Sequence, residues 1–503
     1  MGYLDAHLPS GNSKARSVKT DWSGLDRKRT QDTGYLSRAE NIVTTHLPFL
    51  RVAEENEVVA SFLGNDVYSV HDLGDGAFAV TRLQGKNEAA GTATLMLVYV
   101  TENGVQIPAS TVLSSSFPYT KGTPISVVPF NVYSSEDDNI VTATYDRRIL
   151  IYPFCMSFTR PTGVVGMITL TSFNTEDNAV PQLDIAAVHQ GRVFGVKDGK
   201  VFASAWNNYA DFTLPNADDA SVGIAEGGAW VSATQSDINA SGEFTALAVY
   251  DNHVVAFKRN FMHQIYNNKN PFRIADIARI GALSQRAVCE CNRVLFFVSE
   301  DGIYAYTGGY PECLSDNLEI SSFEGAVLGA DDRVVYCYIP SEGIFTYDTV
   351  SRSWGMIEHE LSAPIYCAKC GNDGIFAANR MDGTVPIGEI KRFGGGPCGY
   401  FLFETDMSYG GELIEKRILR IRLQVARLSA SADGGDSVRL SLMKDGKMAA
   451  YKMMDLKENK TYVLSLAVRC TCAFGHKIRV EGYGDVEIRY LQIEYEEGGQ
   501  RYV

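Results

Sequence analysis

One short pattern recurs along the middle of this chain: an apolar, aromatic-rich run, a polar turn that contains Gly, and a second run of the same kind. It occurs at 193–202, 294–304 and 334–345, with turns that contain Asp-Gly or Glu-Gly. Two β-forming runs joined by such a turn predict a β-hairpin. Because hairpins repeated at a near-constant interval are typical of propeller blades, the pattern constrains the fold more strongly than the activity.

Hairpin patterns follow one another from residue 55 to residue 400, and their starts lie roughly 35 to 60 residues apart, near the period of a four-stranded blade. Helical periodicity is almost absent, and Pro and Gly fall between the runs. The sequence therefore predicts an all-β fold in which residues 55–400 form a six- or seven-bladed β-propeller. The predicted hairpins cover 58–82, 93–106, 140–158, 185–206, 246–266, 287–306, 327–347 and 365–378.

The pattern changes after the glycine-rich stretch at 394–397. Apolar and polar residues alternate along 419–425, which indicates a strand with one solvated face. Further runs at 438–442, 461–468 and 486–495 are separated by turn residues, with no helical pattern between them. We therefore expect residues 401–503 to form a C-terminal β-sandwich.

Residues 1–54 are polar, with few apolar side chains. Such a segment cannot bury enough surface to fold alone, so its order must come from docking against another surface. We expect an extended N-terminal arm, with a neighbouring subunit as its simplest partner. The candidate contact residues are Trp22, Leu25, Arg27, Arg29, Asn41, Pro48 and Phe49.

The composition is ordinary for a folded protein, with 45% hydrophobic and 21% charged residues among 503. The net charge of −14 argues against a general nucleic-acid binder, since binding phosphates requires clustered Lys and Arg. We expect no secretion signal and no membrane span, because no long uninterrupted apolar stretch occurs. The ten cysteines lack dense regular spacing, which favours free thiols in a reducing compartment.

Motifs that carry chemistry are scarce. Cys367-x-x-Cys370 has the spacing of half a zinc site, but no second pair completes four ligands, so two turn-flanking thiols are the simpler interpretation. The eight histidines are scattered, and no hydrolase or nucleotide-binding motif occurs. Trp206, Trp230 and Trp354 suit either sugar stacking or blade packing. The sequence predicts no catalytic residue, no metal and no cofactor.

Several short phrases resemble propeller-type structural proteins of tailed bacteriophages. In those proteins a similar phrase in the arm leads into the first blade. Later phrases look like their blade repeats. The arm phrases lie at 22–29, 34–35, 40–42 and 47–50, and the blade phrases at 201–206, 254–258, 280–284 and 297–304.

The resemblance implies a non-enzymatic virion structural protein, made in the host bacterial cytoplasm, that builds a ring in the neck or tail and connects or closes the DNA conduit. It implies other neck and tail proteins and further copies of this chain as partners. It also implies transient proximity to passing DNA without tight binding. The net negative charge suits such a conduit, because a wall that attracted phosphates would impede passage.

A second function of a different class stays open: a carbohydrate-binding or glycan-cleaving β-propeller whose terminal sandwich is a glycan-binding module. An arm buried on another chain would favour the virion protein. An open pocket with apolar and acidic lining at the propeller mouth would favour the glycan protein.

Overall fold

The computed structural model describes most of the chain, and its strands account for nearly all of the regular structure. Among the described residues helix is confined to two 3₁₀ turns, η1 (Tyr119–Lys121) and η3 (Gln285–Ala287). This confirms the predicted all-β fold. No helix in this part of the chain is long and apolar enough to cross a membrane. The described residues are 16–28, 34–134, 144–161, 163, 165–174, 180–213, 227–230, 242–266, 269, 272–340, 342–357, 363–406, 416–430, 435–444, 446–472 and 476–497.

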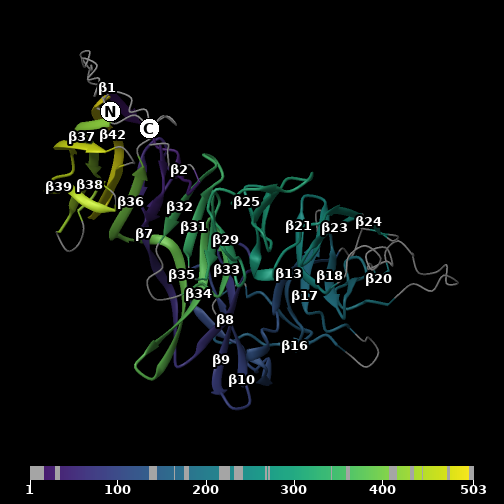
Figure 1. Ribbon diagram of the computed structural model, residues 1–503. Coiled ribbons are helices and arrows are strands. Elements are labelled where there is room, and N and C mark those ends of the chain that lie inside the picture. The colour runs from purple at the N-terminus through teal and green to yellow at the C-terminus, as the bar shows by residue number, and fades with distance from the viewer. Residues whose placement is uncertain are drawn as a thin grey trace.

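Antiparallel sheets follow one another along the central part of the chain (Figure 1). The first four, here called sheets 1 to 4, are each built from consecutive strands. Sheet 1 contains β8 (Asp66–Asp72), β9 (Phe78–Asn87), β10 (Thr92–Val100), β11 (Gln106–Pro108) and β12 (Ser114–Phe117). Sheet 2 contains β13 (Ser126–Ser134), β14 (Thr144–Tyr152), β15 (Met156–Thr159) and β16 (Thr171–Ser172). Sheet 3 contains β17 (Ile185–His189), β18 (Arg192–Lys197), β19 (Lys200–Ala203) and β20 (Ala229–Trp230), and sheet 4 contains β21 (Phe244–Tyr250), β22 (His253–Lys258), β23 (Phe261–Tyr266) and β24 (Arg273–Ala278).

Sheets 5 to 7 continue the series. In all seven sheets, the first strand lies beside the first strand of the next sheet. The order of contacts is β8, β13, β17, β21, β25, β29, β33 and back to β8, so the first strands form a closed ring. Sheet 5 contains β25 (Val288–Cys291), β26 (Val294–Val298), β27 (Ile303–Tyr306) and β28 (Glu312–Cys313). Sheet 6 contains β29 (Val327–Ala330), β30 (Val334–Ile339), β31 (Gly343–Asp348) and β32 (Ser353–Ile357), and sheet 7 contains β33 (Tyr366–Cys370), β34 (Asp373–Asp382), β35 (Val385–Cys398) and β7 (Glu54–Leu63).

The hairpin turns follow the chemistry of the sequence. Asp198 and Gly199 connect β18 to β19, and both have positive φ, 49° and 69°. A two-residue turn with positive φ at both positions matches the right-handed twist of the flanking strands, and Asp-Gly adopts it at little cost. The turn also fixes the place of the Asp198 carboxylate.

Sheet 7 is completed by a strand from the other end of the chain. β7 pairs antiparallel with β35, from Leu63 opposite Ile387 to Glu54 opposite Cys398. β7 then leads through Gly64 and Asn65 directly into β8 of sheet 1. One short segment therefore belongs to sheet 7 through β7 and to sheet 1 through β8. The pairing of β7 with β35 closes the ring where these two sheets meet, a place here called the seam.

We expect Phe62→Ala to lower the free energy of unfolding by about 3–5 kcal/mol, because Phe62 is 3% exposed in the core between sheets 7 and 1. Leu63→Ala is the matched control in the same strand, since Leu63 is 73% exposed, and its effect should stay within about 0.5 kcal/mol. Chemical denaturation of the full chain measures both. Equal effects of the two changes would show that β7 does not close the core.

Two further antiparallel sheets lie at the C-terminal end of the chain (Figure 1), and their side chains share one apolar core. One face of that core comes from β37, β40 and β42, and the other from β36, β38 and β41. The strands are β36 (Tyr400–Asp406), β37 (Lys416–Arg427), β38 (Ser437–Lys444), β39 (Lys447–Asp455), β40 (Thr461–Cys472), β41 (His476–Tyr483) and β42 (Val486–Glu497).

Short strands of the N-terminal segment tie these sheets to sheet 6. β4 pairs with β36, β5 pairs with β32 of sheet 6 and with β6, and β6 and β1 pair with β42. The result is one extended sheet that runs from β29 to β40. The segment contains β1 (Arg16–Thr20), β2 (Gly24–Leu25), β3 (Tyr35–Leu36), β4 (Arg38–Glu40), β5 (Ile42–Val43) and β6 (Leu50–Val52).

Candidate functional site

A cavity of about 460 Å³ lies where the strands of the ring begin. Its lining comes from the start of β17, β21 and β33, from the residues that precede β13 and β25, and from β8. Because six of the seven sheets contribute, we place the cavity at the axis of the ring and call it the mouth cavity. The polar and charged side chains of its lining include those of Tyr68, Ser69, Asp184, Asp198, Glu243, Arg286 and Tyr366.

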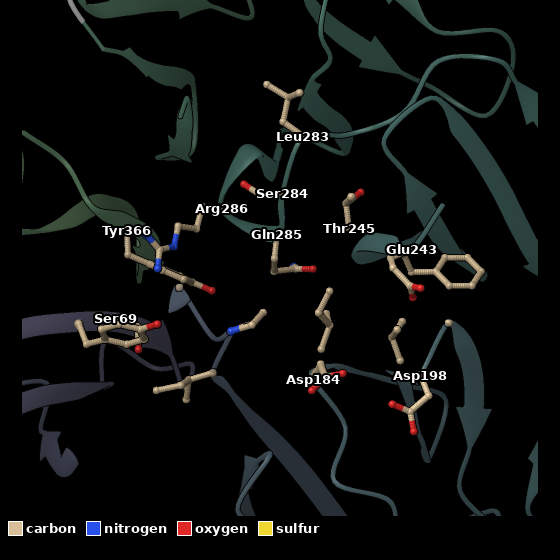
Figure 2. Close-up of a pocket in the computed structure, with 18 residues that line it drawn as sticks. Ser69, Asp184, Asp198, Glu243, Thr245, Leu283, Ser284, Gln285, Arg286 and Tyr366 are labelled. Atoms are coloured by element: carbon tan, nitrogen blue, oxygen red, sulfur yellow. The ribbon is translucent and has the colours of Figure 1, made fainter. Parts of the chain in front are cut away.

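Three carboxylates gather on one side of the mouth cavity, as Figure 2 shows. Asp184 precedes β17, and its Oδ1 lies 3.3 Å from Lys197 Nζ. Asp198 occupies the hairpin turn described above. Glu243 precedes β21 beside that turn, since a Cβ placed on Gly199 would lie 3.1 Å from Glu243 Oε2. Among the described residues Glu243 has no ion-pair partner, so its carboxylate is available to a ligand.

The opposite side of the mouth cavity carries the Arg286 cation beside Tyr366 (Figure 2), and Tyr68 also contacts this cation. The Arg286 guanidinium carbon lies 5.8 Å from the centre of the Tyr68 ring and 5.7 Å from that of Tyr366. The Tyr68 hydroxyl donates a hydrogen bond to the Thr123 carbonyl oxygen at 2.7 Å, which fixes its ring. Cation–π contact on two sides restrains the guanidinium, and no carboxylate of the described residues forms an ion pair with it.

A buried histidine, His71, lies next to Ser69 and Tyr366 on the side of the mouth cavity that carries Arg286. His71 Nε2 is 2.8 Å from Ser69 Oγ, and its ring centre is 5.1 Å from that of Tyr366. Burial, assisted by the positive charge of Arg286, lowers the pKa of His71 to about 3. Burial also raises the pKa of Tyr366 to about 12. Both groups are therefore neutral at pH 7, and Arg286 carries the positive charge of this side.

The segment that carries Arg286 is held by its neighbour. Gln285 Oε1 accepts a hydrogen bond from the Leu247 backbone N–H at 2.8 Å, and Gln285 Nε2 donates to the Leu247 carbonyl at 3.1 Å. The Thr245 hydroxyl donates to the Ala282 carbonyl oxygen at 2.6 Å. These contacts join η3 to β21, so the cationic and acidic sides keep a fixed separation.

The low pKa of His71 makes the fold sensitive to acid. The unfolded chain binds a proton at this residue below pH 6.5 and the folded chain does not until about pH 3, so stability is complete above pH 6.5 and falls as the pH drops. At pH 5 the loss is about 2 kcal/mol from this residue. In His71→Phe the difference in unfolding free energy between pH 7 and pH 5 should shrink by that amount.

The exposed His46 is the control for this prediction, and His46→Gln should keep the pH dependence of the natural chain. Urea denaturation at both pH values measures the effect. An unchanged pH dependence in His71→Phe would contradict the account of this residue.

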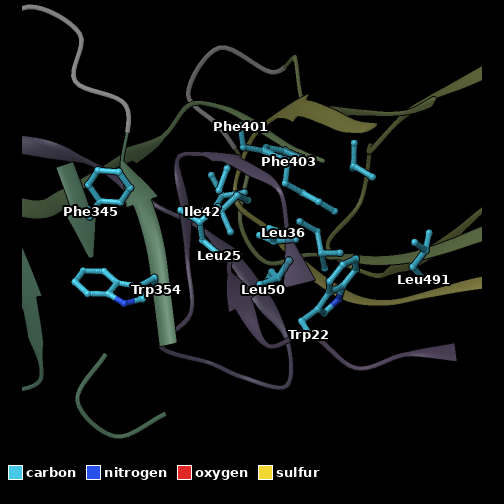
Figure 3. Close-up of a cluster of buried hydrophobic side chains, with 14 of the residues drawn as sticks. Trp22, Leu25, Leu36, Ile42, Leu50, Phe345, Trp354, Phe401, Phe403 and Leu491 are labelled. Atoms are coloured by element: carbon cyan, nitrogen blue, oxygen red, sulfur yellow. The ribbon is translucent and has the colours of Figure 1, made fainter. Parts of the chain in front are cut away.

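The residues predicted for the N-terminal arm lie mainly in the chain's own core, as Figure 3 shows for Trp22 and Leu25. Trp22 is 3% exposed and makes an edge-to-face contact with Phe403 at 5.2 Å between ring centres. Arg27 Nη1 lies 3.1 Å from Glu342 Oε2. Asn41 Nδ2 donates to the Tyr400 carbonyl at 2.8 Å. These side chains therefore join parts of one chain.

The remaining arm residues are less informative. Pro48 and Phe49 are exposed, and the Phe49 ring centre lies 6.0 Å from the Arg489 guanidinium carbon. Arg29 lies outside the described residues. A contact between this segment and a neighbouring subunit stays a prediction.

The Cys367 and Cys370 thiols lie on the first strand of sheet 7. Burial raises the pKa of both, to about 11 for Cys370, and Cys370 Sγ donates to the Gly76 carbonyl oxygen at 3.1 Å. Across the part of the chain that the structure describes, no three His, Cys, Asp or Glu side chains are grouped so that they could hold a metal ion. This pair is accounted for as protonated thiols in the ring.

Sequence reasoning missed every charged residue of the mouth cavity. Asp198 and Gly199 were recognised as a turn, which was the one local signal available. Glu243 and Arg286 stand in unremarkable surroundings in the sequence. Only the ring brings them to one cavity.

No protein-family model matches the chain, and no curated protein matches it. Several solved structures are similar. One is a puromycin-hydrolysing peptidase of Mycobacterium tuberculosis, with 12% identity over 69% of this chain and 58% of that chain and a TM-score of 0.37. A family 43 arabinoxylan arabinofuranohydrolase from Bacillus subtilis has 10% identity over 88% and 96%, with a TM-score of 0.21, and Trypanosoma rangeli sialidase has 7% identity over 97% and 96%, with a TM-score of 0.27.

These comparisons contradict the predicted function as a non-enzymatic virion protein, and with it the prediction that the chain is not an enzyme. The three structures named above are hydrolases, and two of them, the arabinofuranohydrolase and the sialidase, correspond to the alternative glycan-related function. The low TM-scores of these structures carry no argument about a ligand. The resemblance to phage propellers, the virion location and the partners stay predictions.

Proposed function

We propose that this chain is a seven-bladed β-propeller with a C-terminal β-sandwich, and that it binds and cleaves glycans in the mouth cavity. Support for the architecture comes from the ring of first strands, in which sheets 1 to 7 are the blades and β7 completes the last one. The two C-terminal sheets with a common core are the sandwich.

The observation that carries the functional proposal is the grouping of carboxylates and tyrosines around one axial cavity. A volume of about 460 Å³ lies within the usual range for ligand pockets. Carboxylates accept hydrogen bonds from sugar hydroxyls, and aromatic faces cover the apolar faces of sugar rings. Asp184, Asp198 and Glu243 supply the first kind of group, and Tyr68 and Tyr366 supply the second.

Cleavage is supported by the number of carboxylates. Glycoside hydrolysis uses one carboxyl group to protonate the leaving oxygen and a second as base or nucleophile. Three such groups line the mouth cavity. We assign the proton transfer to Glu243, since Asp184 and Asp198 both pair with Lys197, at 3.3 Å and 4.0 Å from its Nζ, and Glu243 has no ion-pair partner among the described residues.

The sandwich offers a second surface for sugars. Tyr451 is 60% exposed on β39 and Tyr483 is 55% exposed at the end of β41. We assign this part of the chain the role of an auxiliary glycan-binding module.

The test uses the purified full chain and a panel of bacterial and plant oligosaccharides, with calorimetry for binding and reducing-sugar release for cleavage. We expect Asp198→Asn and Glu243→Gln each to weaken binding of a glycan ligand by about 10-fold or more, because a charge-assisted hydrogen bond is lost. Glu243→Gln should also slow cleavage by about 100-fold or more.

The matched control is Glu102→Gln. Glu102 is exposed, follows β10 and does not line the mouth cavity. This variant should leave affinity and rate within about 2-fold of the natural chain. Absence of binding across the panel, or equal behaviour of Glu102→Gln and Glu243→Gln, would overturn the proposal.

A further inference from the structure

Arg286 is the one feature of the mouth cavity that a neutral sugar does not explain. Its guanidinium is half-buried between two tyrosine rings, and in the described part of the chain no carboxylate pairs with it. A half-buried charge without a counter-ion is stabilised by an anionic group that enters the cavity, so Arg286 favours a ligand that carries such a group.

The distribution of charge in the cavity restricts what that group is. Arg286 lies beside Tyr366 on one side, and Asp198 and Glu243 lie on the other (Figure 2). His71, which lies near Arg286, is neutral at pH 7 and adds no charge to the cavity. A fully anionic ligand would be repelled by the carboxylates, and a fully neutral one would leave Arg286 unpaired. The cavity therefore fits a ligand with one negative group at one end and hydroxyl groups at the other.

The guanidinium also restricts the geometry of the negative group. Its planar set of N–H donors matches the two oxygens of a carboxylate, and two such hydrogen bonds form in parallel. Cation–π contact with Tyr68 and Tyr366 restrains the guanidinium before the ligand arrives, so less side-chain freedom is lost on binding.

We propose that the glycan recognised in the mouth cavity contains an acidic sugar, and that Arg286 binds its carboxylate while Asp198 and Glu243 contact its hydroxyl groups. This inference rests on the proposed function and names its substrate class. Arg286 is then the residue that determines specificity for charge.

The test compares two pairs of probes. The members of the first pair differ in the charge of their carboxyl groups, and those of the second pair differ by one acidic sugar. Trigalacturonic acid is paired with its methyl ester, and sialyllactose with lactose. Calorimetry on the full chain should show that the acidic member of at least one pair binds about 10- to 100-fold more tightly than the neutral member. In Arg286→Gln the two members should bind within about 3-fold of each other.

Two further variants complete the design. Arg286→Lys keeps the charge but lacks the planar donors, so it should retain only part of the preference. Arg273→Gln, an exposed arginine on the outer strand of sheet 4, should leave the preference unchanged. Binding of the neutral probe by each variant reports an intact cavity, and if Arg286→Gln fails this check, the loss of preference is measured with Arg286→Lys.

The outcomes separate this inference from the proposed function. Equal binding of acidic and neutral probes by the natural chain, or a preference that survives in Arg286→Gln, overturns the inference and leaves glycan binding standing. Failure of all four probes together with the wider panel overturns the proposed function, and the inference falls with it.

Discussion

The pairing of β7 with β35 is the constraint on which the rest of this structure depends. It joins a strand near the start of the chain to one more than 300 residues later, at the separation of Leu63 from Ile387. Since β7 continues through a tight turn into β8, the last sheet and the first are held by one covalent segment. Without that pairing β35 becomes an unpaired edge of sheet 7, and sheets 7 and 1 are no longer tied together by one segment.

Closure of the ring creates the mouth cavity and places its positively charged side opposite its negatively charged side. Ser69 and Tyr366 come from sheets on the two sides of the seam, and Arg286 is positioned against both through its contacts with Tyr68 and Tyr366. The carboxylates of Asp184, Asp198 and Glu243 come from sheets 3 and 4, on the opposite side of the ring. The charge separation is therefore a consequence of where each sheet lies in the ring, and the contacts of Gln285 keep it fixed.

Local patterns in the sequence predicted the hairpins of sheets 3 to 7, but the predicted hairpin 58–82 joins β7 of sheet 7 to β8 of sheet 1, and these two strands do not pair. Runs such as 294–298 favour a strand on a half-buried pleated surface, and turns such as Asp198-Gly199 favour a tight hairpin. The cavity was not predictable in this way, because Glu243 and Arg286 become neighbours only through contacts between distant strands. Trp22 shows the same limit, since a lone aromatic residue in a polar segment reveals that it docks but not on which surface. The structure places it on the chain's own core.

The most direct test of this account is hydrogen exchange of the backbone amides along β7 in the full chain. If β7 closes the ring, its amides that bond to β35 can exchange only when the ring opens, so they should exchange as slowly as those of β34 and β35. Rapid exchange along β7 while β34 and β35 stay protected would contradict the account, because it would show that the ring and its mouth cavity stand without the closing strand.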